Sequence, residues 1–366
     1  MDLELTDEQL ELRDTVRSFL AKECPIGLVR DVVEKGARPE RLWASMVELG
    51  WPALLVPESA GGVGLGFVEL AVLAEEAGRT LTPGPFLATA TQFVPAVLEA
   101  GSPEQQERFL GAVARGETTG TLAVAGDGGT TARRQGDDWV LTGITRYVLD
   151  GASAGEIVVA ARTGEDNAEG IGLFVVPGAS VAASVIDSVD SSRELADVAL
   201  DEVRVTPDRV LDEPGRAGAA LSRAVEQATV ALALDGVGAC QSIFDIALDH
   251  AKQREQFGVP IGSFQAIKHK FADMLVALEK ARATAYFAAL TIAEDDGRRE
   301  LAVATAKAAA GDCQRLLAQE GIQIMGGIGY TWEHDMHLYV KRAKADDALF
   351  GTGITHRARV AGLIGL

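Results

Sequence analysis

A sharp break between two helical patterns, in residues 247–274, constrains the fold of this chain more than any other feature of its sequence. Before the break, Ala247 and Ala251 have the spacing of one helix face. The helix is predicted to end near Gly258-Val259-Pro260, because proline disfavours a helical conformation in the residue before it and has no N–H for a helical ladder. The chain must therefore turn a helical corner here.

The second helix of this corner is predicted to begin at Ser263, which is a favourable N-cap residue. Its predicted apolar stripe consists of Phe264, Ile267, Phe271, Met274 and Leu275. Three polar residues, Arg254, Glu255 and Gln256, fall at the end of the first helix. A plain corner of a helical bundle does not require such polar chemistry, so this corner is a candidate binding site.

Before this corner, the pattern of apolar residues in the sequence changes twice. Residues 1–118 have helical periodicity, including a capping-box pattern at Thr6 and Gln9. Residues 119–213 consist of short β-branched segments separated by Gly, Asp, Asn and Ser, and residues 214–366 are helical again. We therefore predict an α+β fold with an N-terminal helical domain, a middle antiparallel β-barrel or sandwich domain, and a C-terminal four-helix bundle.

Composition excludes several classes of partner. The 366-residue chain has a formal net charge of −19, which argues against nucleic acid and anionic membrane surfaces. It has three widely spaced cysteines, which form neither a disulfide framework nor a metal-binding pattern. No signal peptide and no uninterrupted apolar run of membrane-spanning length is expected. The sequence thus predicts a cytoplasmic protein in a reducing compartment, without a metal site.

Two motifs make the chain resemble the acyl-CoA dehydrogenase family of flavoproteins. The pattern R-x-x-F-G-x-x-I-x-x-F-Q is met by Arg254, Phe257, Gly258, Ile261, Phe264 and Gln265. The pattern Q-x-x-G-G-x-G-Y is met further along the chain by Gln323, Gly326, Gly327, Gly329 and Tyr330. The two motifs are separate and occur in the expected order, which makes the resemblance strong, and the resemblance implies the architecture of the family over nearly the whole chain.

The resemblance implies an FAD-dependent α,β-desaturation of an acyl-CoA thioester, in which a carboxylate takes the α-proton. It also implies a tetramer with itself or with a homologous subunit, and re-oxidation by an electron-transferring flavoprotein. The cofactor-binding residues that it implies are Arg254, Gln256, Phe264, Gln265, Gln323, Gly326, Gly327 and Thr352. In this family, such residues reach the adenosine diphosphate half of the flavin of a neighbouring subunit.

The catalytic base of the family has no counterpart in this chain. Many members carry a glutamate immediately before a Gly-Thr pair, and here Phe350 precedes Gly351 and Thr352. Other members carry the base on the preceding helix, where this chain has Ala228. The neighbouring acids remain as alternatives: Glu226, which is expected to face away, and Asp346 and Asp347, which are expected to be solvated acids at a helix end. No catalytic residue is therefore assigned.

The segments that hold the flavin ring in resembling proteins are also altered. One such segment is replaced here by residues 123–128, without its usual threonine and proline, and the other by Tyr147-Val148-Leu149, without its usual hydroxyl. Three hypotheses follow. The chain is the base-lacking subunit of an α2β2 acyl-CoA dehydrogenase, a homotetrameric enzyme with a displaced base, or a non-catalytic protein that binds acyl-CoA or an acyl carrier.

Overall fold

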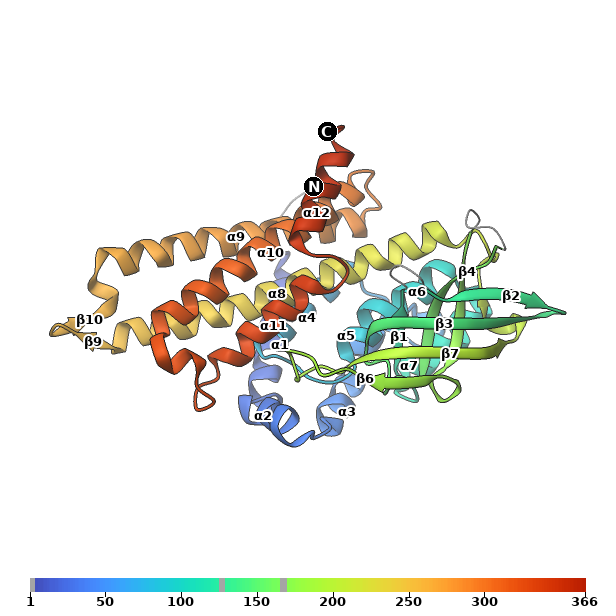
Figure 1. Ribbon diagram of the computed structural model, residues 1–366, viewed down its shortest axis with the longest axis horizontal. Helices are drawn as coiled ribbons and strands as arrows, with labels where there is room; N and C mark the ends of the chain where they lie inside the picture. Colours follow the sequence, from blue (N-terminus) through green and yellow to red (C-terminus); the bar gives the residue numbers. More distant parts are fainter. Residues whose placement is uncertain (1–3, 125–128, 165–169) are drawn as a thin grey trace. The chain divides into compact units, whose positions relative to one another are not determined.

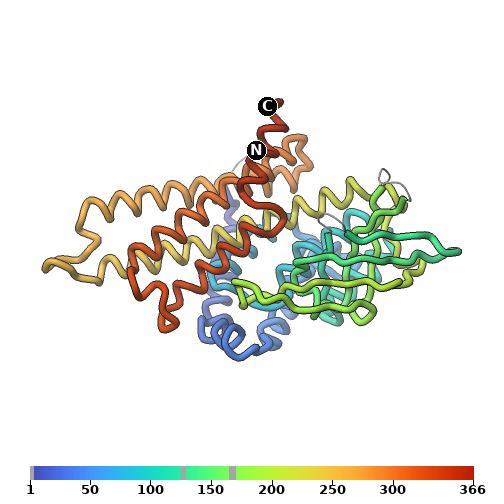
Figure 2. Tube along the Cα trace, viewed as in Figure 1, coloured from blue at the N-terminus to red at the C-terminus, as the bar shows by residue number. Residues whose placement is uncertain are grey.

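The computed structural model describes residues 4–124, 129–164 and 170–366 (Figures 1 and 2). The chain forms two compact units that are not contiguous in sequence. Unit 1 comprises residues 1–36, 67–82 and 229–366, and unit 2 comprises residues 37–66 and 83–228. The long helix α8, Gly218–Gln253, contributes its beginning to unit 2 and the remainder to unit 1.

Unit 1 is helical. Its elements besides α8 are α1 (Asp7–Glu23), α2 (Ile26–Lys35), α4 (Phe67–Arg79), β9 (Glu255–Gln256), β10 (Val259–Pro260), η6 (Ile261–Ser263), α9 (Gln265–Ala293), α10 (Arg299–Met325), η7 (Gly326–Tyr330), α11 (Met336–Ala348) and α12 (Gly353–Leu363). The predicted capping box begins α1, where the Thr6 hydroxyl accepts from the Gln9 N–H at 3.3 Å. The prediction from that sequence pattern is confirmed.

Unit 2 combines short helices with a sheet. Its helical elements are α3 (Glu40–Glu48), η1 (Trp51–Ala53), η2 (Glu58–Ala60), α5 (Phe86–Ala88), the π-helical turn η3 (Thr89–Phe93), α6 (Val94–Ala100), α7 (Pro103–Ala114), η4 (Gly178–Ser180) and η5 (Pro207–Arg209). Its strands are β1 (Gly120–Ala123), β2 (Thr131–Gln135), β3 (Asp138–Leu149), β4 (Glu156–Arg162), β5 (Ile171–Pro177), β6 (Ala182–Val185), β7 (Leu195–Val205) and β8 (Val210–Leu211).

The eight strands form one sheet in the order β6-β7-β3-β2-β4-β5-β8, with β1 paired to β4. Strand β5 is buried at Phe174, Val175 and Val176, as its unbroken apolar run predicts. Most pairings are antiparallel, as expected, but β1 runs parallel to β4, and β2 meets β4 in parallel at Thr131 and Arg162. Both parallel contacts join strands that are separated by other elements, which strand periodicity alone does not indicate.

Two predictions from the sequence, the N-cap of α9 and one residue of its apolar stripe, were wrong. Ser263 is not the N-cap of α9, because its hydroxyl donates to the Pro260 carbonyl and Phe264 occupies the cap position without a side-chain bond. Leu275 is 44% exposed and is not part of the core stripe, whereas Phe271 and Met274 are buried. Helix α8 is long and apolar enough to cross a membrane, but 72% of its most apolar window is buried, as in a core helix.

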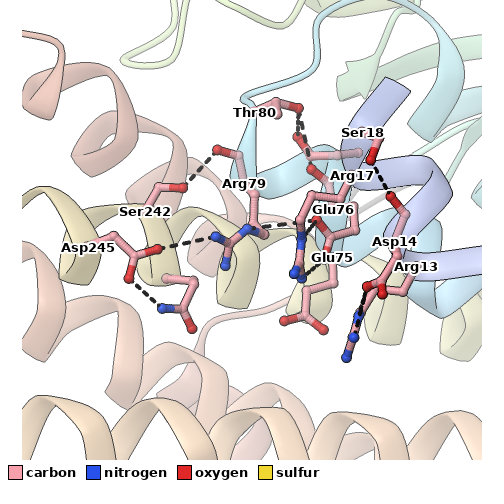
Figure 3. A network of polar contacts seen from close by, with 12 residues as sticks. Arg13, Asp14, Arg17, Ser18, Glu75, Glu76, Arg79, Thr80, Ser242 and Asp245 are labelled. Carbon is pink, nitrogen blue, oxygen red and sulfur yellow. Dashed lines mark hydrogen bonds and ion pairs between the residues drawn. The ribbon is translucent and has the colours of Figure 1, made fainter. Parts of the chain in front are cut away.

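A polar network fastens the N-terminal helices of unit 1 to its bundle (Figure 3). Glu76 of α4, which is buried, accepts two hydrogen bonds from Arg17 of α1 at 2.6 and 3.0 Å. Its neighbour Glu75 accepts from Arg282 and from the Tyr286 hydroxyl of α9, both at 2.8 Å. Because each buried carboxylate is paired and hydrogen-bonded, the network keeps segments distant in sequence in one body.

Candidate functional site

The helical corner predicted from the sequence is a two-residue β-hairpin between α8 and α9. Gln256 of β9 pairs with Val259 of β10, and the turn residues Phe257 and Gly258 have φ angles of 56° and 77°. Two consecutive positive φ angles are typical of a type I′ turn, in which glycine is favoured at the second position. The Phe257 ring is 94% exposed and contacts Phe264 edge-on at a centroid distance of 6.2 Å. The corner is therefore a projecting, ordered hairpin (Figure 1).

Arg254 lies at the base of this hairpin and presents its charge to solvent. Its backbone is fixed at both ends, since its N–H donates to the His250 carbonyl and its carbonyl accepts from the Ile261 N–H, each at 2.8 Å. The Arg254 side chain is exposed and has no hydrogen bond or ion pair to any residue within 4–124, 129–164 and 170–366. An unpaired guanidinium on a fixed backbone is available to a phosphate or carboxylate.

The start of α9 adds further donors beside Arg254. Gln265 is the first residue of this 29-residue helix and is exposed, and the helix has no side-chain cap. The unpaired N–H groups of a first turn and the helix dipole both favour an anion at this position. Gln256, Phe264 and Gln265 are therefore all exposed on the corner that carries Arg254.

The second motif lies at the same end of the bundle. Gln323, Gly326 and Gly327 are exposed at the end of α10 and the start of η7. An ion pair between Lys270 of α9 and Glu320 of α10 joins the two helices near these ends. Both Figures 1 and 2 show β9–β10 and η7 toward the same end of unit 1. These two segments carry seven of the eight predicted cofactor residues, and their joint role in one site stays a prediction.

The glycines of the second motif keep the backbone accessible. Gly326 has φ 66° and ψ −147°, a conformation that is essentially restricted to glycine. A Cβ atom built on Gly326 or Gly327 would meet nothing within 4 Å, so the space beside this backbone is open. The Gly326 N–H donates to the Ile322 carbonyl, and the open space beside this backbone permits close approach of a ligand.

Thr352 lies apart from the other seven residues. It is the N-cap of α12 and its hydroxyl accepts from the Thr355 N–H at 3.2 Å. The next residue, Gly353, packs on Gly311 of α10, with the Gly311 Cα at 3.3 Å from a Cβ built on Gly353. Gln323 is twelve residues beyond Gly311 in the same helix, which corresponds to about 18 Å along its axis.

Phe350 occupies a strained and braced turn between α11 and α12. Its φ angle is 53°, in the left-handed region that is unfavourable for a bulky side chain, and Gly351 has φ 94°. The His356 Nε2 atom lies 2.9 Å from the Phe350 carbonyl, and the Asp347 Oδ1 atom accepts from the Gly353 N–H at 3.0 Å. The turn is therefore held on both sides.

The two acids before Phe350 are engaged in the fold. Asp346 is fully buried, so the expectation that it is a solvated acid is wrong. Buried Lys307 of α10 donates to the Asp346 backbone carbonyl. Burial lowers the pKa of Lys307 to about 8, although the charges of Asp346 and Asp347 act in the opposite direction. Asp347 is half-buried and caps the start of α12.

The remaining candidates lie in unit 2. Ala228 and Glu226 of α8 are both buried, so burial does not distinguish the alanine position from its acidic neighbour. In β3, Val148 and Leu149 are buried, and the Leu149 carbonyl accepts from the Thr121 hydroxyl at 2.6 Å. Tyr147 is 60% exposed with φ 59°. In the stretch of residues 123–128, residues 125–128 lie outside the described residues.

Two bracing residues were not recognised from the sequence. Lys307 stands in an alanine-rich helix, where a lysine on a buried face would have been the available signal. The bond between His356 and the Phe350 carbonyl depends on a turn geometry that sequence spacing does not indicate. Both residues act on the turn rather than on a ligand.

Comparisons with known proteins indicate the family of this chain. A family model described as "Acyl-CoA dehydrogenase, N-terminal domain" matches residues 6–117, and one described as "Acyl-CoA dehydrogenase, C-terminal domain" matches residues 218–364. The chain is 33% identical over 339 residues to "Acyl-CoA dehydrogenase IpdE2" of Mycobacterium tuberculosis, which covers 92% of this chain and 91% of that protein.

Two solved structures are similar along almost their full length. One is described as the ChsE4-ChsE5 complex from Mycobacterium tuberculosis, with a TM-score of 0.92, 25% identity and 100% of each chain covered. The other is described as a Tcur3481-Tcur3483 steroid ACAD variant, with a TM-score of 0.87, 29% identity and 98% of each chain covered.

Proposed function

We propose that this chain, which belongs to the acyl-CoA dehydrogenase family, is the base-lacking subunit of an α2β2 heterotetramer that desaturates an acyl-CoA thioester. Members of the family depend on FAD, which accepts the β-hydrogen of the substrate as hydride. A homologous partner subunit would hold the flavin ring and supply the carboxylate that takes the α-proton.

The observation that carries this proposal is the contrast between two sets of residues. Seven of the eight residues that resemble a binding site for a neighbour's nucleotide are exposed, and the Arg254 guanidinium has no partner among the described residues. The set that would serve a flavin in the same chain has buried apolar side chains at Val148 and Leu149. This contrast supports a chain that would bind the adenosine diphosphate half of FAD, with the flavin ring held by the partner subunit.

The chemistry of each half supports this division. Arg254 would hold the pyrophosphate through charge-assisted hydrogen bonds, assisted by the first turn of α9. Gln323 can donate to and accept from an adenosine group, and Gly326 leaves its backbone accessible to it. Phe350 at the position of the base has no proton acceptor, so this chain supplies binding and orientation but no proton transfer at that position.

The displaced-base alternative gains little from the geometry. Asp347 already accepts the Gly353 N–H, and Asp346 lies buried beside the Lys307 ammonium. A carboxylate committed to such contacts is poorly placed to move a substrate proton. The role of a base-lacking subunit therefore agrees better with the observed contacts than the role of an enzyme with a displaced base.

Descriptions of two similar structures extend the proposal to assembly and substrate. The ChsE4-ChsE5 structure is named as a complex, and the Tcur3481-Tcur3483 protein is named as a steroid ACAD. We propose that this chain likewise assembles with a homologous but different subunit. We also propose that its substrate is a bulky acyl-CoA, such as a steroid side-chain thioester. An electron-transferring flavoprotein as electron acceptor and a cytoplasmic location complete the proposal.

Co-expression with a homologous subunit that carries the glutamate tests the proposal. We expect the chain alone to be colourless and inactive, and the co-purified complex to have a flavin spectrum and to desaturate acyl-CoA with an artificial electron acceptor. A matched complex in which the partner's glutamate is changed to glutamine should keep the flavin and lose turnover. Stoichiometric FAD and turnover in this chain alone would contradict the proposal and favour a displaced base.

A further inference from the structure

The segment between η7 and α11, residues 331–335, is held against α11 by an aromatic contact. The rings of Trp332 and His337 meet edge-on with their centroids 4.7 Å apart. The Lys341 ammonium, about one helical turn beyond His337, lies 4.5 Å from the centroid of the Trp332 ring. Trp332 is 59% exposed, whereas His337 is buried. Two side chains of α11 therefore hold an exposed indole against the helix.

A second histidine in this segment fixes the start of α11. The His334 Nδ1 atom lies 3.1 Å from the Met336 backbone nitrogen. Because a backbone N–H only donates, Nδ1 is the acceptor and carries no proton. A second proton on this imidazole would occupy the accepting lone pair and break the hydrogen bond. The contact therefore requires neutral His334.

His337 is also placed in a way that favours its neutral form. Its Nε2 atom is buried and has no hydrogen-bond partner in the part of the chain that the structure describes. An imidazolium donates from both ring nitrogens, so protonation would leave a buried, charged N–H without an acceptor. The closed arrangement of residues 331–337 therefore disfavours protonation of His337.

Basic groups on three helices add to this effect. Burial lowers the pKa of His337, and the charges of Lys341 on α11 and Arg30 on α2 act in the same direction. On α8, the pKa of His250 is lowered by burial and by charges that include His334. Protonation of His250 and protonation of His334 therefore disfavour each other.

The carboxylates near His337 are themselves paired with a cation. The charges of Asp335 and Glu34 favour a protonated His337. Arg30, however, donates to Asp335 at 2.7 Å and to Glu34 at 2.8 Å. A hydrogen bond to its own backbone N–H lowers the pKa of Glu333, so this acid stays ionised in the range where histidines titrate. Arg30 thus offsets the negative charge that would stabilise an imidazolium here.

We propose that residues 331–335 form an acid-released latch, which neutral His334 and His337 hold on α11 and which protonation of these two imidazoles releases. The latch follows η7 directly, so its release should also loosen Gly326–Tyr330. Under the proposed function, acid would then weaken the nucleotide site. Only this consequence rests on the proposed function, since the latch itself needs neither flavin nor a partner subunit.

Hydrogen exchange of the full chain tests the latch. It is measured by mass spectrometry on peptides that cover residues 326–338, with correction for the intrinsic effect of pH. As the pH falls from 7 to 5, the local opening constant should rise by up to about tenfold per pH unit for each histidine that gains a proton on release. An opening constant that does not change over this range would overturn the inference.

Two substitutions remove the titrating groups and keep the contacts. H334N retains a side-chain acceptor for the Met336 N–H, and H337F retains an aromatic ring against Trp332. Each variant should lose part of the pH dependence, and the double variant should lose it entirely. A rise in the double variant equal to that of the wild type would contradict the assignment of the latch to these histidines.

Replacement of a neighbouring charge tests the latch with both histidines in place. K341M removes a cation that opposes protonation of His337 in the closed state, so the rise in the opening constant between pH 7 and pH 5 should be smaller. The control is K344M, because Lys344 is exposed on the same helix and is not among the charges that act on His337. K344M should show the full rise, and equal rises in the two variants would contradict the role of His337.

Discussion

Two regions of unit 1 carry motifs of the same family and have opposite physical character. At the end of the bundle, the residues around the β9–β10 hairpin are exposed, and the Arg254 side chain has no partner among the residues described. At the α11–α12 turn, Phe350 is half-buried, strained and braced by Asp347 and His356. The first region presents an unpaired charge to solvent, whereas neighbouring groups hold the second region in one conformation.

The difference indicates where each region acts. An exposed charge without a partner in the chain is available to an anionic ligand, and its backbone hydrogen bonds fix where the side chain starts. The strain in the turn at Phe350 lowers the stability of the chain with or without a ligand. It persists because the surrounding groups impose the conformation. The two regions can therefore be separated by experiment.

The largest effect is expected at the exposed region. Arg254→Ala in the co-purified complex should weaken FAD binding about 10- to 100-fold, which corresponds to the loss of hydrogen bonds between charged groups. Arg254→Lys should recover part of this loss, since a lysine keeps the charge but not the bidentate geometry. Flavin fluorescence during titration with FAD measures both.

Lys252 provides the matched control for Arg254. It is also basic and exposed, and it precedes Arg254 by two residues at the end of α8, where it pairs with Asp249 at 3.8 Å. Lys252→Ala should leave FAD affinity nearly unchanged. Equal losses from the two alanine variants would mean that general charge, rather than the corner geometry, attracts the cofactor.

The braced region should show its restraint in the pH dependence of stability. Burial lowers the pKa of Lys307 from 10.5 to about 8 in the folded chain. Between these values the unfolded chain holds a proton that the folded chain has released, so the free energy of unfolding should rise with pH across this window. The gain should be at most about 3 kcal/mol, and below pH 8 the cost of the buried charge is present in full.

Lys307→Met tests this contribution, because it keeps the length of the side chain and removes the titrating group. The urea midpoint of the variant minus that of the wild type should fall as the pH rises from 7 to 10, because only the wild type gains stability from Lys307 in this range. Titrating groups common to both proteins cancel in this difference. A difference that is constant with pH would show that Lys307 does not titrate within this window.

The accessible backbone of the second motif should show an intermediate effect. Gly326→Ala should cost about 1–3 kcal/mol of stability, because an alanine does not tolerate the φ and ψ of this position. Gly297→Ala is the control: Gly297 also has open space around it but does not have a positive φ. Urea unfolding measures the stability of both variants. A larger loss of stability in Gly297→Ala than in Gly326→Ala would contradict this interpretation.

Much of the fold followed from periodicity and turn chemistry. Strands β4 (Glu156–Arg162) and β5 (Ile171–Pro177) lie in the range predicted to be β-rich, and α7 (Pro103–Ala114) lies in the helical range before it. Local signals succeed at these places because proline, glycine and polar residues mark both ends of each element. The parallel pairing of β1 with β4 was missed, since it depends on contacts between distant segments rather than on local pattern.

The candidate site was predictable to the extent that it lies on continuous motifs. The resemblance placed Arg254, Gln265 and Gln323 in one site, and the structure has them exposed at one end of the bundle. Burial of Asp346 was not predictable, because its acidic neighbours and basic helix resemble a solvated helix end. Only the packing of α10 beneath the turn places this carboxyl group inside the bundle.

Thr352 offers the finest test of the comparison, because the resemblance assigns it to the cofactor while the structure places it in the braced turn. Thr352→Ala should lower stability by about 1 kcal/mol through loss of the N-cap of α12. The same change should weaken FAD binding by less than about tenfold, as for one neutral hydrogen bond. Thr352→Asn, which preserves a cap but not the hydroxyl, separates the two roles: full stability with weakened FAD binding assigns the hydroxyl to the cofactor, and full stability with unchanged FAD binding assigns Thr352 to the turn alone.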